Sequence, residues 1–285
     1  MPEPPVLLLR NATVIRGQAK VFDRLSLEVP AERNVAILGP NGAGKSTLLQ
    51  LVTRDLYPTY DVDSRIEVLG RVRWNVADLR HLLGVVSHEL QVRHQREIRG
   101  VDVVRSGFFG SIGIHAHQTL DESELARVEE SLERLKIKPL RDRMFNAMSA
   151  GEQRRFLLAR ALVGDPRTLL LDEPTTSLDL RAAFELLTLL RELAREGRRL
   201  VLVTHRVEEI PPEVSWILLL KEGELVAAGE KQDVLRPEAL SDVFEVPLRV
   251  VEREGFYALL PGPEMSAISR ASSVSAGSVR QARTP

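Results

Sequence analysis

The sequence contains no cysteine, which excludes disulfides, thiolate zinc sites and cysteine nucleophiles. Long hydrophobic runs are also missing. The run at residues 216–220, which no other run exceeds, is far shorter than the roughly 20 residues that a membrane-spanning helix needs. Residues 1–5 have neither the basic region nor the apolar region of a signal peptide. These absences predict a cytoplasmic protein.

An excess of charge of either sign is absent as well. The chain has 39 basic and 40 acidic residues among 285, so the broad positive charge of a general nucleic-acid binder is missing, and only a local basic patch stays open. Hydrophobic residues make up 44% of the chain and charged residues 28%, which is typical of a globular protein. This length accommodates one large or two small domains with a sizeable core.

Short apolar runs alternate with helical patterns along most of the chain. We expect strands at residues 6–9, 25–29 and 34–38, a helix at 46–53, a strand pair at 65–74 that turns at Gly70, a helix at 78–83, strands at 84–87, 168–171, 199–203 and 216–220, and a helix at 181–195 that ends before Gly197. This alternation predicts an α/β protein with a mostly parallel sheet.

The stretch between about residues 91 and 160 differs because it is charged and helical. One helix is expected to begin at Asp121 with Glu124 completing a capping box, and a second covers residues 151–163. We therefore place a helical insertion within a main domain of residues 1–245, followed by an extension at 246–263. Residues 264–285 contain six serines and no acidic residue after Glu264, which predicts a disordered tail.

Residues 39–47 match the phosphate-binding pattern G-x-x-x-x-G-K-[ST]. Glycines let successive backbone N–H groups converge on phosphate oxygens, and the dipole of the following helix favours the same anion. The lysine supplies charge to the β- and γ-phosphates, and the serine hydroxyl is a hard ligand for Mg²⁺. The pattern follows an apolar strand and precedes a helix, so it predicts a nucleotide site made of Gly39, Pro40, Asn41, Gly42, Ala43, Gly44, Lys45, Ser46 and Thr47.

Two acidic residues follow the apolar run at 168–171. At the end of a parallel strand they would line the ligand crevice. Asp172 is then expected to bind Mg²⁺ together with Ser46, and Glu173 to polarise the water that attacks the γ-phosphate. Taken alone, the pair is equally compatible with an ordinary Asp-Glu-Pro turn.

Three further motifs surround the acidic pair. Ser149 begins the sequence Ser-Ala-Gly-Glu-Gln, Asp179 ends Ser-Leu-Asp, and His205 follows an apolar strand. With the phosphate loop and the acidic pair they occur in the order typical of ATP-binding-cassette (ABC) ATPases, and residues 6–240 resemble that family. The resemblance implies a P-loop NTPase core with an N-terminal antiparallel β subdomain and an inserted helical subdomain, and an activity that hydrolyses ATP with Mg²⁺.

The resemblance also assigns a signature motif to Ser149, Gly151 and Glu152. In the family this motif contacts the γ-phosphate of ATP bound to the other subunit, which implies a head-to-tail homodimer that shares two ATP molecules. Ala150 stands where the family usually has glycine. Ser149 is also expected to cap the helix that begins near Gly151, so that free backbone amides face an anion.

His205 and Asp179 receive their roles from the same resemblance. His205 would contact the γ-phosphate and support Glu173, whereas a lone histidine at a strand end is otherwise a packing or surface residue. Asp179 would couple the two sites across the dimer.

Two further departures from the family pattern are more informative than Ala150. Arg16 occupies the place of the aromatic residue that stacks on adenine; a guanidinium can also stack on a base, and the alternative is a solvated turn residue. His88 occupies the place of a glutamine that senses Mg²⁺ and the attacking water, and an imidazole there would titrate near neutral pH. Gln91 lies close enough to make this register ambiguous.

Two classes of process could be driven by the predicted ATP hydrolysis. The first is the energy-coupling subunit of a membrane transporter whose transmembrane permease is a separate chain, so that the protein would lie at the inner face of the membrane. Residues 87–90 and 107–113 further resemble the molybdate-transport and photorepair-type subgroup. The alternative is an ABC ATPase that acts on nucleic acid or ribosomes without a membrane partner, and the near-zero net charge weighs against it.

Two loops of the helical insertion carry alternatives of their own. His115 and His117 are interpreted as a polar loop rather than a metal site, because no third ligand candidate lies nearby in the sequence. The loop at residues 107–113 places Phe108 and Phe109 among glycines, which slightly favours a docking surface over a core position.

Overall fold

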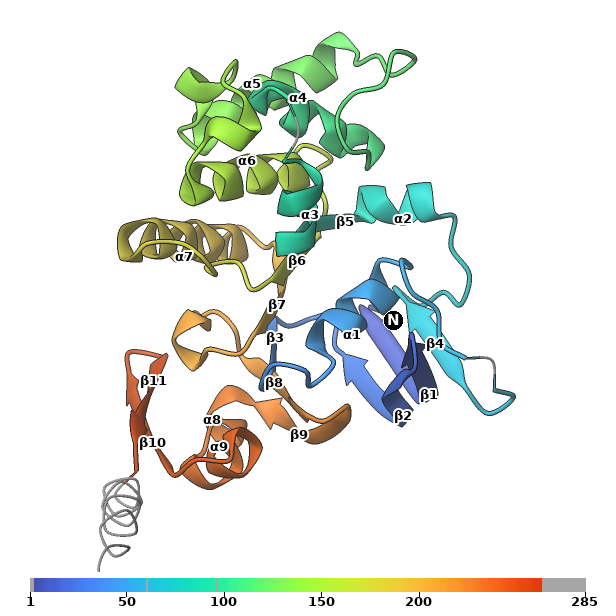
Figure 1. Ribbon diagram of the computed structural model, residues 1–285, viewed down its shortest axis with the longest axis vertical. Helices are drawn as coiled ribbons and strands as arrows, with labels where there is room; N and C mark the ends of the chain where they lie inside the picture. The colour runs from blue at the N-terminus through green and yellow to red at the C-terminus, as the bar shows by residue number, and fades with distance from the viewer. Residues whose placement is uncertain (1–2, 60, 96, 263–285) are drawn as a thin grey trace, which may run out of the picture.

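Figure 1 shows the computed structural model, which describes residues 3–59, 61–95 and 97–262. Within these residues the centre is a six-stranded sheet in the order β5-β6-β7-β3-β8-β9. Neighbouring strands are parallel except for β8 with β9, which confirms the mostly parallel sheet. The strands are β3 (Val35–Leu38), β5 (Leu83–Val86), β6 (Thr168–Asp172), β7 (Arg199–Thr204), β8 (Trp216–Lys221) and β9 (Glu224–Glu230).

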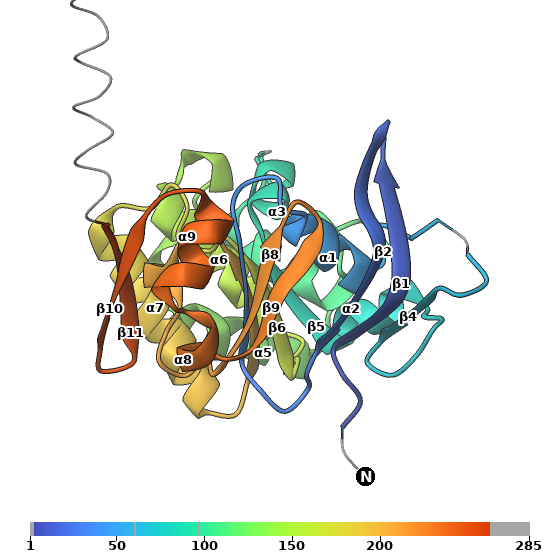
Figure 2. The ribbon, with the colours of Figure 1, turned by 90° about the horizontal axis from the view of Figure 1, so that it is seen from below.

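A smaller antiparallel sheet lies beside the central one, which confirms the expected N-terminal β subdomain (Figure 2). Its order is β2-β1-β4, with β1 at Leu7–Arg16, β2 at Ala19–Val29 and β4 at Arg65–Val68. The helix α1 (Lys45–Val52) contributes Leu48 and Leu51 to a hydrophobic cluster that contains residues of both sheets. This cluster holds the phosphate-binding segment between the two sheets.

The strands β3, β6 and β8 are almost entirely apolar and are buried on both faces of the central sheet, whereas the edge strand β9 has no fully buried residue. Successive side chains of a strand point to opposite faces, so Leu170 packs into the cluster shared with the antiparallel sheet, while Leu169 and Leu171 pack into a second cluster formed with the helices. The ends of the central strands are therefore held from two sides.

The strand pair predicted at residues 65–74 is wrong, because only its first strand forms. β4 ends at Val68, Leu69 and Gly70 follow with φ values of 48° and 74°, and an isolated bridge joins Val68 to Arg71. The indole N–H of Trp74 donates to the carbonyl of Val68 at 2.7 Å. A side chain thus satisfies the strand end, and the chain does not build a further ladder there.

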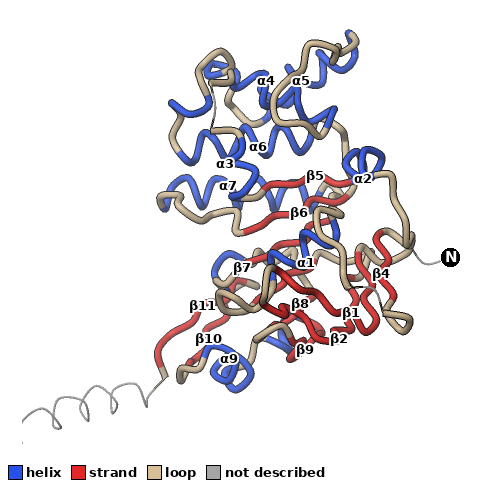
Figure 3. Tube along the Cα trace, turned by 45° about the vertical axis from the view of Figure 1, so that its right-hand side comes forward, coloured by secondary structure: helices blue, strands red, loops and turns tan. Residues whose placement is uncertain are grey.

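Helices fill the connection between β5 and β6 and form one end of the molecule (Figures 1 and 3). The capping box expected at Asp121 and Glu124 is present at the start of α5. The short α2 (Val76–Leu82) precedes β5, and the elements after it are α3 (His88–Arg93), α4 (Gly100–Arg105), the 3₁₀ turn η1 (Ser106–Phe109), α5 (Glu122–Arg134), the 3₁₀ turns η2 (Lys138–Leu140) and η3 (Phe145–Ala147), and α6 (Ala150–Leu162).

The remaining elements complete the sheet and extend beyond it. α7 (Leu180–Arg195) connects β6 to β7 and is followed by Gly197 at φ 91°, as expected for a helix end. The 3₁₀ turn η4 (Val207–Glu209) follows β7, and α8 (Lys231–Val234) and α9 (Pro237–Phe244) follow β9. The hairpin of β10 (Leu248–Arg253) and β11 (Phe256–Pro261) lies within the expected extension at 246–263.

The disordered tail expected at 264–285 falls outside the described residues. Among the residues that the structure describes, no helix combines the length and the apolar character needed to cross a bilayer.

Candidate functional site

The phosphate-binding segment connects β3 to α1. Gly44 is the N-cap of α1 with φ 94°, and a Cβ at this position would lie 2.4 Å from the ring of the buried Phe22. No side chain caps the first turn of α1. The backbone N–H groups of that turn are therefore left for an anion, which the helix dipole also favours.

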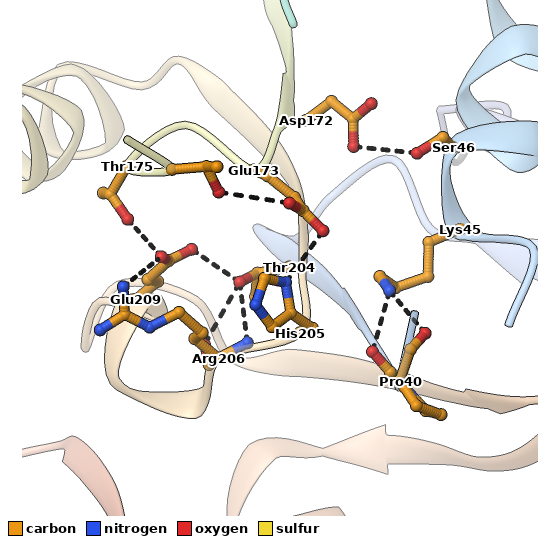
Figure 4. Close-up of polar contacts among 12 residues, drawn as sticks. Pro40, Lys45, Ser46, Asp172, Glu173, Thr175, Thr204, His205, Arg206 and Glu209 are labelled. Atoms are coloured by element: carbon orange, nitrogen blue, oxygen red, sulfur yellow. Dashed lines mark hydrogen bonds and ion pairs between the residues drawn. The ribbon is translucent and has the colours of Figure 1, made fainter. Parts of the chain in front are cut away.

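Lys45 holds its ammonium against this segment (Figure 4). Its side chain is buried, and Nζ donates hydrogen bonds to the carbonyls of Gly39 at 2.9 Å and Pro40 at 2.8 Å. Burial lowers the pKa of Lys45, and the carboxylates of Glu173 and Asp172 oppose that shift. The positive charge is thus fixed between the phosphate-binding amides and two acids.

Asp172 at the end of β6 faces Ser46 at the start of α1. The Ser46 hydroxyl donates to Asp172 Oδ1 at 3.3 Å. Burial raises the pKa of Asp172, and the hydrogen bond from Ser46 opposes this rise. A hydroxyl and a carboxylate at this distance are the hard oxygen donors that Mg²⁺ prefers.

Glu173 is held in an uncommon backbone conformation next to His205. Its φ of 45° lies in the left-handed region, which costs energy for a residue with a Cβ and is concentrated at functional sites. Its N–H donates to the carbonyl of Val203 at 2.8 Å, Oε1 lies 2.9 Å from Nδ1 of His205, and Oε2 accepts from Thr176 at 3.2 Å. The carboxylate is therefore oriented on both oxygens (Figure 4).

A cavity of about 260 Å³ brings these elements together. Arg16, at the end of β1, is among the residues that line this cavity. Its contact with a nucleotide base stays a prediction. The cavity is lined by Arg16, Val21, Asn41, Gly42, Gly44, Lys45, Ser46, Thr47 and Glu173.

The predicted signature lies elsewhere, at the N-terminus of α6. The Ser149 hydroxyl accepts from the N–H of Glu152 at 3.3 Å, and the Glu152 carboxylate accepts from the N–H of Ser149 at 2.7 Å. This capping box confirms that Ser149 caps the helix and places Gly151 in its first turn. Of the described residues that line the 260 Å³ cavity, none belongs to α6. One chain thus holds two separate candidate anion sites.

A family model for ABC transporters matches residues 22–176. The chain belongs to this ABC family. The cobalt import ATP-binding protein CbiO of Rhodobacter capsulatus is 38% identical over 241 residues, which cover 82% of each chain. The hemin import ATP-binding protein HmuV of Streptomyces coelicolor is 34% identical over 274 residues, which cover 93% of this chain and 95% of the relative.

Solved ABC proteins share the fold. A structure of cbiO1 from Clostridium perfringens, described as part of the ABC transporter complex cbiONQ, matches with a TM-score of 0.67 at 26% identity and covers 84% of this chain and 94% of that one. The resemblance that the motifs indicated is therefore confirmed, and the protein is an ABC-type ATPase.

In this ABC ATPase the side chain of His88 makes no hydrogen bond or ion pair with Asp172 or Glu173. The residue is exposed at the start of α3, where Ser87 caps the helix by accepting from Leu90 N at 3.1 Å, and its side chain makes no hydrogen bond or ion pair with any residue that the structure describes. Gln91 is buried instead and donates to Oε1 of Gln153 on α6 at 2.7 Å. The glutamine nearest to the family position is thus engaged with the signature helix.

Asp179 caps α7 by accepting from Ala182 N at 2.8 Å. Immediately after it, Leu180 is 74% exposed and Phe184 is 61% exposed. Residues four apart lie on one face of a helix, so these side chains form an apolar surface next to Asp179. The coupling role predicted for Asp179 stays a prediction.

The loop at residues 107–113 corrects one expectation. Phe108 belongs to the core and stacks against the Arg127 guanidinium at 4.8 Å, and Phe109 is partly buried against the same core. A Cβ on Gly107 would lie 2.2 Å from the carbonyl oxygen of Arg160, so glycine permits the close approach that buries the aromatic rings. The docking surface expected here is therefore wrong for Phe108.

The histidine pair of the neighbouring loop is solvent-accessible. The rings of His115 and His117 are exposed and stack with centroids 5.9 Å apart.

Three polar residues behind the active site were not foreseen. The hydroxyls of Thr175 and Thr204 both donate to the carboxylate of Glu209, which is 3% exposed (Figure 4). The sequence does not single out Glu209, because Glu208 directly precedes it and only the fold determines which of the two carboxylates is buried.

Proposed function

We propose that this ABC ATPase hydrolyses Mg-ATP as a head-to-tail homodimer and energises a membrane transporter whose permease is a separate chain. The hydrolytic part rests on the Glu173–His205 pair at 2.9 Å beside the phosphate-binding segment. The proposed transport role rests on a surface groove that reaches Ser87 and on the names of the relatives, which are import ATP-binding proteins.

Each residue of the site has a chemical task in this proposal. The amides of the α1 N-terminus and Lys45 bind the phosphates, while Ser46 and Asp172 supply oxygen ligands to Mg²⁺. Mg²⁺, when bound, neutralises charge on the phosphate oxygens. Glu173 accepts a hydrogen bond from the attacking water and orients it, and His205 holds the Glu173 carboxylate in place. Arg16 provides a cation to stack on the base.

A second copy completes the site. The N-terminus of α6, with Ser149 and Gly151, presents backbone amides toward an anion but does not reach the cavity of its own chain. The apolar surface of Leu180 and Phe184 lies next to Asp179 and gives the two copies an area to bury against each other. Both features support a shared site, with Asp179 at the contact between copies.

A groove supports the proposal of a membrane partner. Residues of β5 and α3 line one side of the groove, and residues of η1 and α6 line the other. It has a cavity volume of about 110 Å³, and charged residues of both signs line it, including Asp55, Arg80, Glu89 and Arg93. The groove reaches Ser87, directly after β5, and β5 is paired with the strand that ends in Asp172. A segment bound there lies one strand away from the acidic pair, which is a short route for coupling.

The relatives support uptake as the direction of transport. CbiO and HmuV are named as cobalt and hemin import ATP-binding proteins, and cbiO1 is described as part of a larger transporter complex. We extend to this chain the role of an importer subunit, without assigning its cargo.

The experiment follows the protein in membranes of its own host. The wild type is expected in the membrane fraction together with an intact multi-span protein, whereas Arg93→Glu reverses a charge in the groove and should move the protein to the supernatant with unchanged ATPase activity. Arg253→Glu, on the exposed hairpin, is the matched control and should stay in the membrane fraction. Wild type found only in the supernatant, with DNA- or RNA-stimulated ATPase activity, would instead support the nucleic-acid alternative.

A further inference from the structure

Glu209 is a buried carboxylate that joins two segments of the active site. It lies in η4 and is 3% exposed. Its Oε2 accepts from the Thr204 hydroxyl at 2.6 Å, and its Oε1 accepts from the Thr175 hydroxyl (Figure 4). The two threonines are 29 residues apart in sequence (204 − 175), so one carboxylate connects segments that otherwise follow different strands.

The two threonines lie next to the reacting pair. Thr175 is two residues beyond Glu173 on the turn after β6, and Thr204 immediately precedes His205 at the end of β7. The Thr204 oxygen also accepts from the N–H of Arg206 at 3.0 Å, so it orders the backbone on both sides of His205. Fixing both threonines fixes the backbone from which Glu173 and His205 extend.

A stability role alone is a poor reason to bury a carboxylate. Removing a charge from water is costly, and apolar residues of similar volume often stabilise such a position better. What the carboxylate provides is two acceptors with defined directions, since hydroxyl bonds to a charged oxygen are short and strong. Arg206, 3.4 Å away on the exposed side, balances part of its charge.

We propose that Glu209 is a positioning residue for ATP hydrolysis, which holds the turn after Glu173 and the strand end before His205 at the separation that the catalytic pair needs. The inference rests on the roles proposed above for Glu173 and His205. Glu209 itself touches neither side chain and acts through the two threonines.

The first experiment separates turnover from binding in the full-length protein. Glu209→Leu removes both acceptors and is expected to lower kcat by about tenfold to a hundredfold while KM for ATP changes less than twofold, because misplaced catalytic groups slow the chemical step. Glu209→Gln keeps an acceptor for one hydroxyl and can donate to the other, so it should restore most of kcat. Thr119→Val, which removes an exposed hydroxyl from the loop before α5, is the control and should match wild type.

The second experiment tests the connection to His205. If Glu209 acts by placing His205 against Glu173, then Glu209→Leu combined with His205→Ala should be no slower than His205→Ala alone. Multiplicative losses in the double variant would overturn the inference. So would an unchanged kcat in Glu209→Leu, or a parallel rise in KM.

Two further variants keep the inference testable if Glu209→Leu fails to fold. Thr175→Val and Thr204→Val each remove one donor and retain the side-chain shape, and each should lower kcat several-fold at constant KM; an unchanged kcat in both would overturn the inference. Glu173→Gln reports on the proposed function separately. Normal turnover in Glu173→Gln contradicts the proposed function, whereas loss of turnover there with normal Glu209→Leu contradicts only the role of Glu209.

Discussion

Two helix N-termini in this protein are candidate phosphate sites, and they are built in opposite ways. At α1 the N-cap is Gly44, no side chain uses the free N–H groups, and a buried lysine stands beside them. At α6 Ser149 and Glu152 form a full capping box, which uses backbone N–H groups and places a carboxylate in the first turn. The first end is prepared for a polyanion, while the second is stable without one.

In the proposed homodimer, this difference explains why one chain needs another. Each helix dipole favours an anion, but a carboxylate in the first turn of α6 reduces the positive potential there. In the proposed homodimer, the end of α6 would therefore gain a phosphate only when a nucleotide already bound at an α1 end is brought against it. We call the N-terminus of α1, with Gly44 and Lys45, the binding end, and the N-terminus of α6, with Ser149 and Glu152, the completing end.

The largest effect is expected at the binding end. Lys45→Ala removes the buried ammonium, and ATP affinity should fall by about a hundredfold or more, since hydrogen bonds to charged groups carry much of the binding energy. Titration with a fluorescent ATP analogue measures this. Lys20→Ala, which removes a surface ion pair with Asp23, is the control and should bind as wild type. Equal affinity for Lys45→Ala and Lys20→Ala would show that the buried ammonium of Lys45 does not bind the phosphates.

Removing the carboxylate of Glu173 should separate binding from turnover. Glu173→Gln keeps the shape of the side chain but cannot accept a proton as the carboxylate does, so kcat should fall by about a hundredfold or more. ATP binding at the α1 end should persist, and gel filtration with ATP should show a long-lived dimer. Wild-type turnover in this variant would show that Glu173 is not the residue that activates water.

A second buried lysine tests whether Lys45 is special. Lys231 donates to the carbonyls of Pro211 at 3.0 Å and Gly255 at 2.8 Å, and burial lowers its pKa to about 8, opposed by Glu213 and Glu252. Between pH 8 and 10 the unfolded chain still holds this proton while the folded chain has released it. Stability should therefore rise with pH in that window.

Lys231→Met should remove this pH dependence. Relative to Lys231→Met, the free energy of unfolding of the wild type should increase by about 1–3 kcal/mol from pH 7 to pH 10, as measured by urea unfolding. ATP binding at pH 7 should be unchanged, in contrast to Lys45→Ala. A constant difference between the two proteins across this range would argue against a lowered pKa.

The smallest effect is expected at the completing end. Glu152→Gln keeps an oxygen to accept from Ser149 N but removes the negative charge, so the ATP concentration for half-maximal dimer formation should fall about two- to fivefold. Glu124→Gln changes the same position of the capping box of α5 and serves as the matched control. A similar shift in both variants would assign the effect to net charge rather than to the end of α6.

Much of the fold could be predicted because its determinants are local. Apolar runs such as residues 168–171 and 199–203 are long enough for buried strands only, and the capping boxes at Asp121 and Ser149 mark helix starts within four residues of sequence. The binding end is local too, because all its glycines and Lys45 lie within one loop.

What could not be predicted depends on distant packing. The pairing of Gln91 with Gln153 and the bridge from Glu209 to Thr175 join residues 62 and 34 positions apart. No periodic pattern encodes such pairs. Phe108 is buried because Gly107 lets the chain approach α6, which a reading of the loop as glycine-rich could not reveal.

In the proposed homodimer each site is completed by the other copy, and this can be tested by mixing two inactive proteins. Glu173→Gln keeps ATP binding at its own α1 end but loses turnover there. Ser149→Asp retains a good N-cap but places negative charge against the phosphate, so it should disable its own completing end. Each protein alone should hydrolyse ATP at least tenfold slower than wild type.

Mixed in equal amounts before ATP is added, the two variants can form one intact site, made from the α1 end of Ser149→Asp and the α6 end of Glu173→Gln. Half of the dimers would be mixed with one intact site of two, so we predict about a quarter of wild-type ATPase activity. Activity no greater than the mean of the two separate proteins would contradict completion of the site by a second copy.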